Sequence, residues 1–269
     1  MENNVIIITG TNSPSGIGWA TAIEIAKKQP KAIYVTDIRD DQLHVLAQTL
    51  REQYNVDGIA RIVDASSSEQ VKAVVDEAIS TYGRLDVFFA NAAIVSLARL
   101  HEETKTDFLK TMEVNTWSVF TAIQYASTAM EKTSETKKVS GGSIIATSSI
   151  AAYRSGAGPI SYAASKAAIL SLVKLAAWEL KEKNIRVNAV CPGFIATDLT
   201  VPAIKALDKI DPDAATRQNP LGRFGVPTEI ATTVAFLASL ESSFINGQDI
   251  KIDGGFGASY RYVPLFGDA

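Results

Sequence analysis

VIIITGTNSPSGIGWATAIEIAKK, residues 5–28, decides the fold of this chain, because it joins an apolar run to a glycine-rich turn and then to a helical pattern. The run Val5–Thr9 consists of residues that favour strands, and apolar side chains recur at helical spacing from Gly18 onward. A strand, a glycine-rich turn and a helix in this order form the start of a dinucleotide-binding βαβ unit.

The turn TGTNSPSGIG differs from the usual G-x-G-x-x-G fingerprint, because five residues separate Gly10 from Gly16. A helix that begins near Gly16 presents free N–H groups and a partial positive charge to an anion. Gly16 and Gly18 allow the backbone to approach a ligand closely, and Ser13 and Ser15 offer hydroxyl donors. The stretch therefore predicts a phosphate site with an enlarged loop. A turn that needs glycine and binds nothing is the alternative.

Short β-branched runs alternate with longer helical patterns along the rest of the chain. The strand-like runs are continuously apolar, which is typical of strands buried on both faces of a parallel sheet. We therefore predict one α/β domain over residues 1–269, a doubly wound, Rossmann-type three-layer sandwich around a mostly parallel seven-stranded sheet. The predicted strands cover residues 5–9, 32–37, 59–64, 85–91, 142–149, 185–193 and 248–255.

Two segments are predicted to be insertions between these elements. Residues 131–142 are polar, so we expect them to face solvent. The stretch 198–220 contains three prolines between short helical pieces, and we predict a substrate lid there; an ordinary surface excursion is the alternative.

Composition and charge exclude several functional classes. The 269 residues are 46% hydrophobic with a net charge of −3, which suits a packed globule and offers no basic stripe for nucleic acid or a membrane surface. Cys191 is the one cysteine, and His44 and His101 stand far apart, so neither a disulfide framework nor a metal site is predicted. No signal peptide or membrane span is evident. We expect a cytoplasmic protein.

An acidic residue ends the second predicted strand, where the dinucleotide fingerprint places a ribose-binding carboxylate. Asp37 stands nineteen residues after Gly18. A carboxylate at this position repels a 2′-phosphate, so it favours NAD over NADP. Arg39 is the alternative, because its guanidinium is able to bind that phosphate. We predict NAD, with NADP the less favoured cofactor.

Three residues suggest acid–base chemistry beside this site. Tyr162 and Lys166 lie four apart on a predicted helix, so they share one face. Ser149 ends a predicted strand thirteen residues earlier, and such positions meet above a parallel sheet. A nearby ammonium lowers the ordinary tyrosine pKa of about 10, and a serine hydroxyl can hold a substrate oxygen. A surface Tyr–Lys pair without function is the alternative.

In these motifs the chain resembles the compact, single-domain branch of the short-chain dehydrogenase/reductase family. The resemblance covers nearly the whole chain and includes the TG…GIG turn, ANAAI, NTWSVF, TSS, YAASK, NAVCPGFIAT and IDGG. The chain departs from the family in two places. Its glycine turn is two residues longer than TGxxxGxG, and Ile94 stands where the family commonly has glycine.

The resemblance implies roles for individual residues. Asn115 would hold, through its backbone, a water that relays protons to Lys166, and so completes the catalytic set Asn115, Ser149, Tyr162 and Lys166. Asp64 and Ala65 would contact the adenine, and Ile195 and Thr197 the carboxamide. The implied cofactor-binding residues are Gly10, Asn12, Ser13, Ser15, Gly16, Ile17, Asp37, Ile38, Asp64, Ala65, Asn91, Ala92, Ala93, Tyr162, Lys166, Pro192, Gly193, Ile195 and Thr197.

The resemblance implies an NAD(H)-dependent oxidoreductase that interconverts a secondary alcohol and a ketone by direct hydride transfer, in a homodimer or homotetramer. The alternatives are an NADP-dependent 3-oxoacyl or polyketide-type ketoreductase, a non-catalytic nucleotide sensor, and a redox-neutral enzyme of the same fold. We expect an apolar substrate wall from Val95, Tyr153, Phe194 and Leu199, with Arg154 as the candidate for binding an anionic group.

Overall fold

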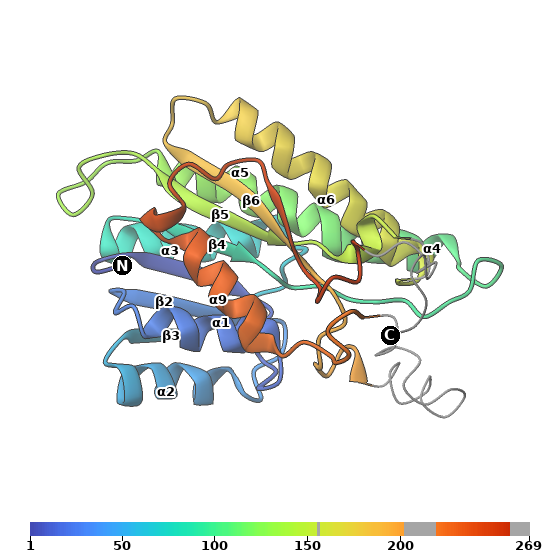
Figure 1. Cartoon of the computed structure of the whole chain (residues 1–269). Coiled ribbons are helices and arrows are strands. Elements are labelled where there is room, and N and C mark those ends of the chain that lie inside the picture. Colours follow the sequence, from blue (N-terminus) through green and yellow to red (C-terminus); the bar gives the residue numbers. More distant parts are fainter. Residues whose placement is uncertain (155–156, 202–218, 259–269) are drawn as a thin grey trace, which may run out of the picture.

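Seven strands form one parallel sheet at the centre of the protein (Figure 1). The computed structural model describes residues 1–154, 157–201 and 219–258. The strand order is β3-β2-β1-β4-β5-β6-β7, and every pairing among these strands is parallel. The strands are β1 (Val5–Thr9), β2 (Ala32–Asp37), β3 (Asp57–Ile62), β4 (Val87–Ala90), β5 (Gly142–Thr147), β6 (Ile185–Pro192) and β7 (Asp249–Ile252). The predicted doubly wound, seven-stranded α/β sheet is confirmed.

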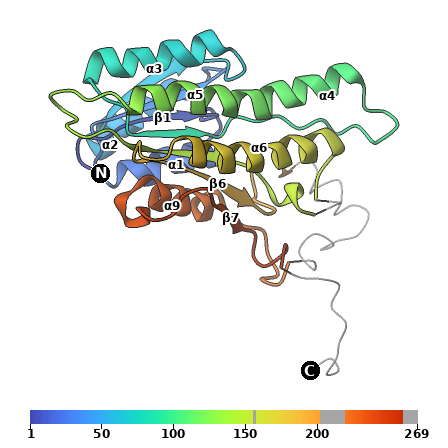
Figure 2. The ribbon, with the colours of Figure 1, turned by 90° about the horizontal axis from the view of Figure 1, so that it is seen from above.

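Helices cover both faces of this sheet and complete three layers, as Figure 2 shows from above. One face carries α1 (Ile17–Ala26), α2 (Leu43–Tyr54) and α9 (Pro227–Ala238). The other carries α3 (Ser68–Tyr82), α4 (Lys105–Met112), α5 (Ser118–Met130) and α6 (Ile160–Glu179). The π-helix η1 (Glu113–Trp117) joins α4 directly to α5.

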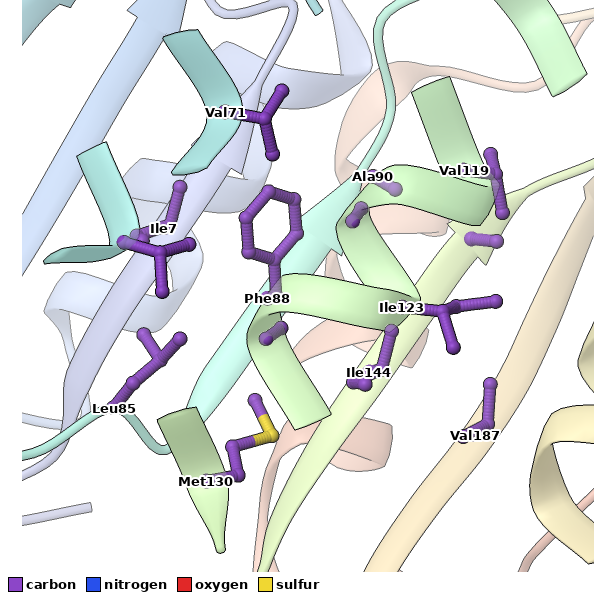
Figure 3. Close-up of a cluster of buried hydrophobic side chains, with 14 of the residues drawn as sticks. Ile7, Val71, Leu85, Phe88, Ala90, Val119, Ile123, Met130, Ile144 and Val187 are labelled. Atoms are coloured by element: carbon purple, nitrogen blue, oxygen red, sulfur yellow. The ribbon is translucent and has the colours of Figure 1, made fainter. Parts of the chain in front are cut away.

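Each face of the sheet has its own apolar core, because neighbouring strand residues point to opposite sides. On one side Phe88 of β4 lies between Ile7 of β1 and Ile144 of β5, with Val71 of α3 and Ile123 of α5 above the sheet (Figure 3). These residues are buried. Burial on both faces explains the continuous apolar runs of β1 and β2, whereas β3, at the edge of the sheet, is partly exposed.

Helix α6 has the length and apolar composition of a membrane span, and it is the one described helix that does. Ile169, Leu170 and Val173 on this helix are buried in the core beside β5 and β6. A core helix of this length passes the same test of length and composition.

Two residues of the segment 131–142, Lys137 and Gly141, are buried and not exposed as expected. Lys137 is buried, and its ammonium donates hydrogen bonds to the carbonyl oxygens of Leu85, Met130 and Gly141 at 2.7, 3.0 and 2.7 Å. Burial lowers the pKa of Lys137, while Asp86 opposes that shift. The prediction of a solvent-facing segment is thus wrong for Lys137, because three carbonyls replace the water around its charge.

Candidate active site

The glycine-rich turn packs its backbone against the ends of two strands. Gly10 has a φ of +71°, and a Cβ there would lie 2.9 Å from the Cα of Ala92. A Cβ on Gly18 would lie 2.2 Å from the carbonyl oxygen of Gly10. The stretch NSPS, in which the turn is two residues longer than the family pattern, forms a compact loop, because the Gly16 N–H donates to the carbonyl of Ser13 at 2.8 Å. The longer turn therefore keeps the close packing that glycines permit.

The turn also leaves the start of α1 open to an anion. Gly16 is the N-cap of α1, and glycine has no side chain with which to satisfy the first helical N–H groups. These groups and the helix dipole favour a negatively charged ligand. The arrangement fits the pyrophosphate of a dinucleotide.

A cavity of about 430 Å³ extends from this turn along the carboxyl ends of the strands. The ends of β1, β4, β5 and β6 all contribute to its lining. The lining includes most residues that the sequence predicts: Gly10, Ser13, Gly16, Ile17, Asp37, Asn91, Ala92, Ala93, Ser149, Tyr162, Lys166, Pro192, Gly193, Ile195 and Thr197. A larger cavity, of about 670 Å³, lies at the amino ends of the strands around Asp86 and Lys137 and contains none of them.

Asn91 joins three of the strands at the floor of the smaller cavity. Its amide nitrogen donates to the carbonyls of Thr9 and Gly10, each at 3.1 Å. Its amide oxygen accepts a hydrogen bond from the hydroxyl of Thr147 at 3.0 Å. The carboxyl ends of β1, β4 and β5 are thereby held together through one side chain.

Six predicted residues do not line this cavity. The side chain of Asn12 is buried, and Ile38 is 64% exposed on the outside. The carboxylate of Asp64 accepts hydrogen bonds from the N–H and hydroxyl of Ser66, and Ser67 rather than Asp64 caps α3. The remaining three are Ser15, Ala65 and Asn115. The sequence fingerprint locates the turn and strand ends well, but not which of their neighbours face inward.

Asp37 lines the cavity, with both carboxylate oxygens held by backbone groups. One oxygen accepts from the N–H of Asn12 at 3.1 Å and the other from the N–H of Arg39 at 3.2 Å. Arg39 lines the same cavity. The two residues that favour opposite cofactors therefore lie at one end of the site.

Ser149, Tyr162 and Lys166 lie together at the other end. Lys166 is buried, and its ammonium donates to the carbonyl of Thr147 at 2.7 Å. The Lys166 nitrogen lies 5.5 Å from the centre of the Tyr162 ring. Ser149 lines the cavity beside Tyr162, and its hydroxyl accepts from the N–H of Ala151 at 3.1 Å. A phenol, a serine hydroxyl and a lysine amine thus share one corner of the cavity.

The pKa values of Tyr162 and Lys166 differ from the sequence-based expectation. Burial raises the pKa of the Tyr162 hydroxyl, and the hydrogen bond from Ser149 opposes that shift. Burial also lowers the pKa of Lys166 to about 7. The expected lowering of the Tyr162 pKa by Lys166 is therefore wrong for the protein alone. A lysine with this pKa carries only part of its charge at neutral pH, so its field on the phenol is weak.

Asn115 occupies the π-helix η1 and is buried. Its amide oxygen accepts from the N–H of Ile94 at 2.8 Å, and its amide nitrogen donates to the carbonyl of Ile94 at 2.9 Å. The same nitrogen donates to the hydroxyl of Ser165, which donates to the carbonyl of Tyr162. Asn115 therefore joins the chain after β4 to the helix that carries Tyr162. The proton relay through its backbone stays a prediction.

The expected apolar wall is divided between two places. Leu199 lines the cavity, whereas Phe194 packs against Phe256 with ring centres 5.2 Å apart. The hydroxyl of Tyr153 donates to Asp249. Arg154 donates to the carbonyl of Phe256 and lies 4.1 Å from the centre of its ring, so it already contacts the C-terminal segment. Most of the predicted lid, residues 202–218, lies outside the described residues.

Sequence reasoning gave no site role to four residues that line the cavity, Thr147, Ser148, Asp198 and Thr200. Thr147 and Ser148 precede Ser149, and the hydroxyl of Ser148 donates to the carbonyl of Lys166 at 2.8 Å. Asp198 lies beside the glycine turn, where its carboxylate accepts from the Ser13 hydroxyl at 2.6 Å. The position of Ser148 in the TSS motif was a signal for its role. No local pattern pairs residues 185 positions apart.

Comparison with known proteins identifies relatives over almost the whole chain. The profile of the family described as enoyl-(acyl carrier protein) reductase matches residues 10–257. The chain is 37% identical to 3-oxoacyl-(acyl-carrier-protein) reductase FabG of Thermotoga maritima, over 95% of this chain and 98% of that protein. It is 35% identical to L-rhamnose-1-dehydrogenase of Scheffersomyces stipitis, over 95% and 96% of the two chains. Among solved structures, levodione reductase matches with a TM-score of 0.87 and 30% identity, over 97% of this chain and 100% of that one.

Proposed function

Because this chain belongs to the short-chain dehydrogenase/reductase family, whose members are oxidoreductases that bind a nicotinamide cofactor, we propose that it interconverts a secondary alcohol and a ketone with NAD(H). One observation carries the proposal. A single cavity is lined by the glycine turn, by Asp37, and by Ser149, Tyr162 and Lys166. It therefore combines groups suited to a dinucleotide with groups suited to proton transfer at an alcohol oxygen.

The roles of the three residues follow from their contacts. A bound nicotinamide cofactor supplies or accepts the hydride. During ketone reduction the Tyr162 hydroxyl donates its proton to the oxygen that gains negative charge, and during alcohol oxidation the phenolate accepts it. The Ser149 hydroxyl, in the same cavity lining as Tyr162, holds the same oxygen. Lys166 would hold the nicotinamide ribose, as the family resemblance implies, and favours the phenolate when it is charged.

The protonation state of Tyr162 in the protein without cofactor suits the role of proton donor in ketone reduction. With its pKa above the ordinary value of about 10, the phenol holds its proton at neutral pH. Protonated phenol is the form that a general acid requires.

The choice of NAD rests on Asp37, and the substitution Asp37→Ser tests it. Removing the carboxylate removes both the acceptor for the ribose hydroxyls and the charge that repels a 2′-phosphate. We expect NADH to bind about tenfold more weakly and NADPH about tenfold more tightly than in the wild type. Fluorescence titration of each reduced cofactor measures both constants. Arg39→Ser is the matched control, because it changes a neighbouring charged residue in the same lining; NADH binding should be almost unchanged.

The second candidate is an NADP-dependent ketoreductase that acts on 3-oxoacyl groups. Two observations favour it: Arg39 lines the cavity, and several relatives are named 3-oxoacyl-(acyl-carrier-protein) reductase. A wild-type preference for NADPH of about a hundredfold would refute NAD as the cofactor. A panel of secondary alcohols, cyclic ketones and 3-oxoacyl thioesters, followed by absorbance of the reduced cofactor, separates the substrate classes.

We further propose a homo-oligomer, dimer or tetramer, that uses the exposed apolar surface of α4, η1 and α5. Trp117 and Phe120 stack with ring centres 5.3 Å apart and remain 45% and 39% exposed. Leu109 and Leu172 line the same shallow hollow. A second copy of the chain suits this surface, because a two-fold contact buries the same apolar patch on both subunits.

The substitution Trp117→Lys is expected to shift the protein toward smaller assemblies. It places a charge in the apolar patch, which opposes burial against a second copy. Size-exclusion chromatography with light scattering, over a range of protein concentrations, measures the change in mass. Val139→Lys alters another exposed apolar residue away from this patch and should leave the mass unchanged. A monomeric wild type would refute the proposed contact.

A further inference from the structure

The cavity contains a negatively charged group supplied by the chain itself. The carboxylate of Asp198 accepts a hydrogen bond from the Ser13 hydroxyl at 2.6 Å. The N–H of Asp198 donates to the Ser15 hydroxyl at 3.2 Å, and the two serine hydroxyls lie 3.2 Å apart. Asp198, Ser13 and Gly16 line the same cavity. A carboxylate thus lies against the turn whose geometry fits a pyrophosphate.

This contact depends on the unusual length of the glycine turn. Ser13 and Ser15 belong to NSPS, the stretch in which the turn exceeds the family's TGxxxGxG by two residues. The backbone hydrogen bond from Gly16 to Ser13 folds this stretch into a compact loop. The hydroxyls of Ser13 and Ser15 on this loop both contact Asp198. The longer turn therefore holds the start of the segment that follows β6.

Hydrogen bonds and a nearby positive charge favour the ionised form of Asp198. Hydrogen bonds from Ser13 and Ser15 lower its pKa, and the positive charge of Arg39 adds to the effect. Asp198 is exposed, so its side chain has room to leave the turn.

We propose that Asp198 competes with the cofactor's pyrophosphate for the glycine turn, and so sets how tightly this chain binds a dinucleotide. The inference rests on the proposed function, because it takes the cavity as a dinucleotide site. Two anions repel each other when they share one set of donors. Binding therefore requires the Asp198 carboxylate to withdraw, after which the hydroxyls of Ser13 and Ser15 are free to donate to phosphate oxygens. Release of Asp198 also frees residues 198–201 from the turn, so cofactor binding is coupled to the position of this segment.

The substitution Asp198→Asn tests the competition directly. Asparagine keeps the side-chain shape and an oxygen that accepts from Ser13, but it removes the charge. We expect the variant to bind NADH about five- to tenfold more tightly than the wild type at low ionic strength. The difference should shrink in about 0.5 M salt, because exposed charges are screened. Asp76→Asn, an exposed acid on α3, is the control with the same change in net charge.

Two fragments of the cofactor locate the effect. ADP carries the pyrophosphate and adenosine does not, so the substitution should strengthen ADP binding by a similar factor and leave adenosine binding unchanged. Calorimetry or displacement of NADH gives these constants without any measurement of turnover. An equal gain for adenosine would place the effect elsewhere in the site and overturn the competition.

The outcomes separate this inference from the proposed function. If wild type and Asp198→Asn bind NADH equally well, the dinucleotide site stands and the competition is overturned. If the variant binds NADH more weakly, Asp198 is a ligand of the cofactor and not its competitor. If the wild type binds no nicotinamide dinucleotide, both the proposed function and the inference fail.

Discussion

Replacing Tyr162 with phenylalanine is expected to lower kcat for ketone reduction by about a thousandfold. The substitution removes the hydroxyl that donates the proton and leaves the aromatic ring in place. Binding of NADH should stay within about twofold of the wild-type value, because the glycine turn and Asp37 are untouched. Steady-state rates with a substrate found in the ketone panel, together with fluorescence titration of NADH, measure the two effects separately.

Tyr125→Phe is the matched control for this substitution. It removes a phenolic hydroxyl from a partly buried tyrosine that packs against the core away from the cavity. Its kcat should equal that of the wild type. A Tyr162→Phe enzyme that kept more than about a tenth of the wild-type rate would exclude Tyr162 as the general acid.

Replacing Lys166 with methionine is expected to change both catalysis and the pH dependence of stability. We expect kcat to fall about a hundredfold or more, because the ribose contact and the positive charge beside Tyr162 are lost. The substitution also removes a buried amine whose pKa is about 7 in the folded protein, against the ordinary lysine value of 10.5. Stability should therefore respond to pH differently in the variant.

The direction of this response follows from proton binding. Between about pH 7 and 10.5 the unfolded chain holds one more proton at Lys166 than the folded chain does. This residue therefore makes the free energy of unfolding rise with pH, by up to about 1.4 kcal/mol per pH unit. Lys166→Met should lose that contribution, so its stability relative to the wild type should be greatest near pH 7 and should fall toward pH 10.

Urea unfolding at pH 7, 8 and 9 measures the difference between variant and wild type. Lys174→Met is the matched control, because Lys174 lies on the same helix with its side chain 58% exposed. It should alter neither kcat nor the slope with pH. Parallel stability profiles for Lys166→Met and the wild type would show that Lys166 does not have a lowered pKa.

The parts of the molecule that sequence predicts well are those encoded within a few neighbouring residues. The apolar runs that became β1, β2 and β4 are continuous because both faces are buried, and that pattern is visible without a structure. The glycine turn and Asp37 are likewise tied to strand ends. The predicted carboxyl ends of the strands were therefore enough to locate the cavity.

What sequence reasoning missed depends on burial and on contacts between distant segments. The polar composition of residues 131–142 gave no sign that Lys137 would be enclosed by three carbonyls. The pairing of Asp198 with Ser13 joins opposite parts of the chain. The raised pKa of Tyr162 reflects the burial of its hydroxyl by neighbouring segments, and residue spacing carries no information on that.

Lys137 also limits which residues evolution can substitute in its loop. An ammonium offers three hydrogens, and here each of them has a carbonyl to receive it. A glutamine side chain has only two N–H hydrogens to donate and methionine has none. Either replacement therefore leaves at least one of the three buried carbonyl oxygens without a hydrogen-bond donor. The composition of this loop suggests that it varies freely, but position 137 requires a side chain that donates three hydrogen bonds.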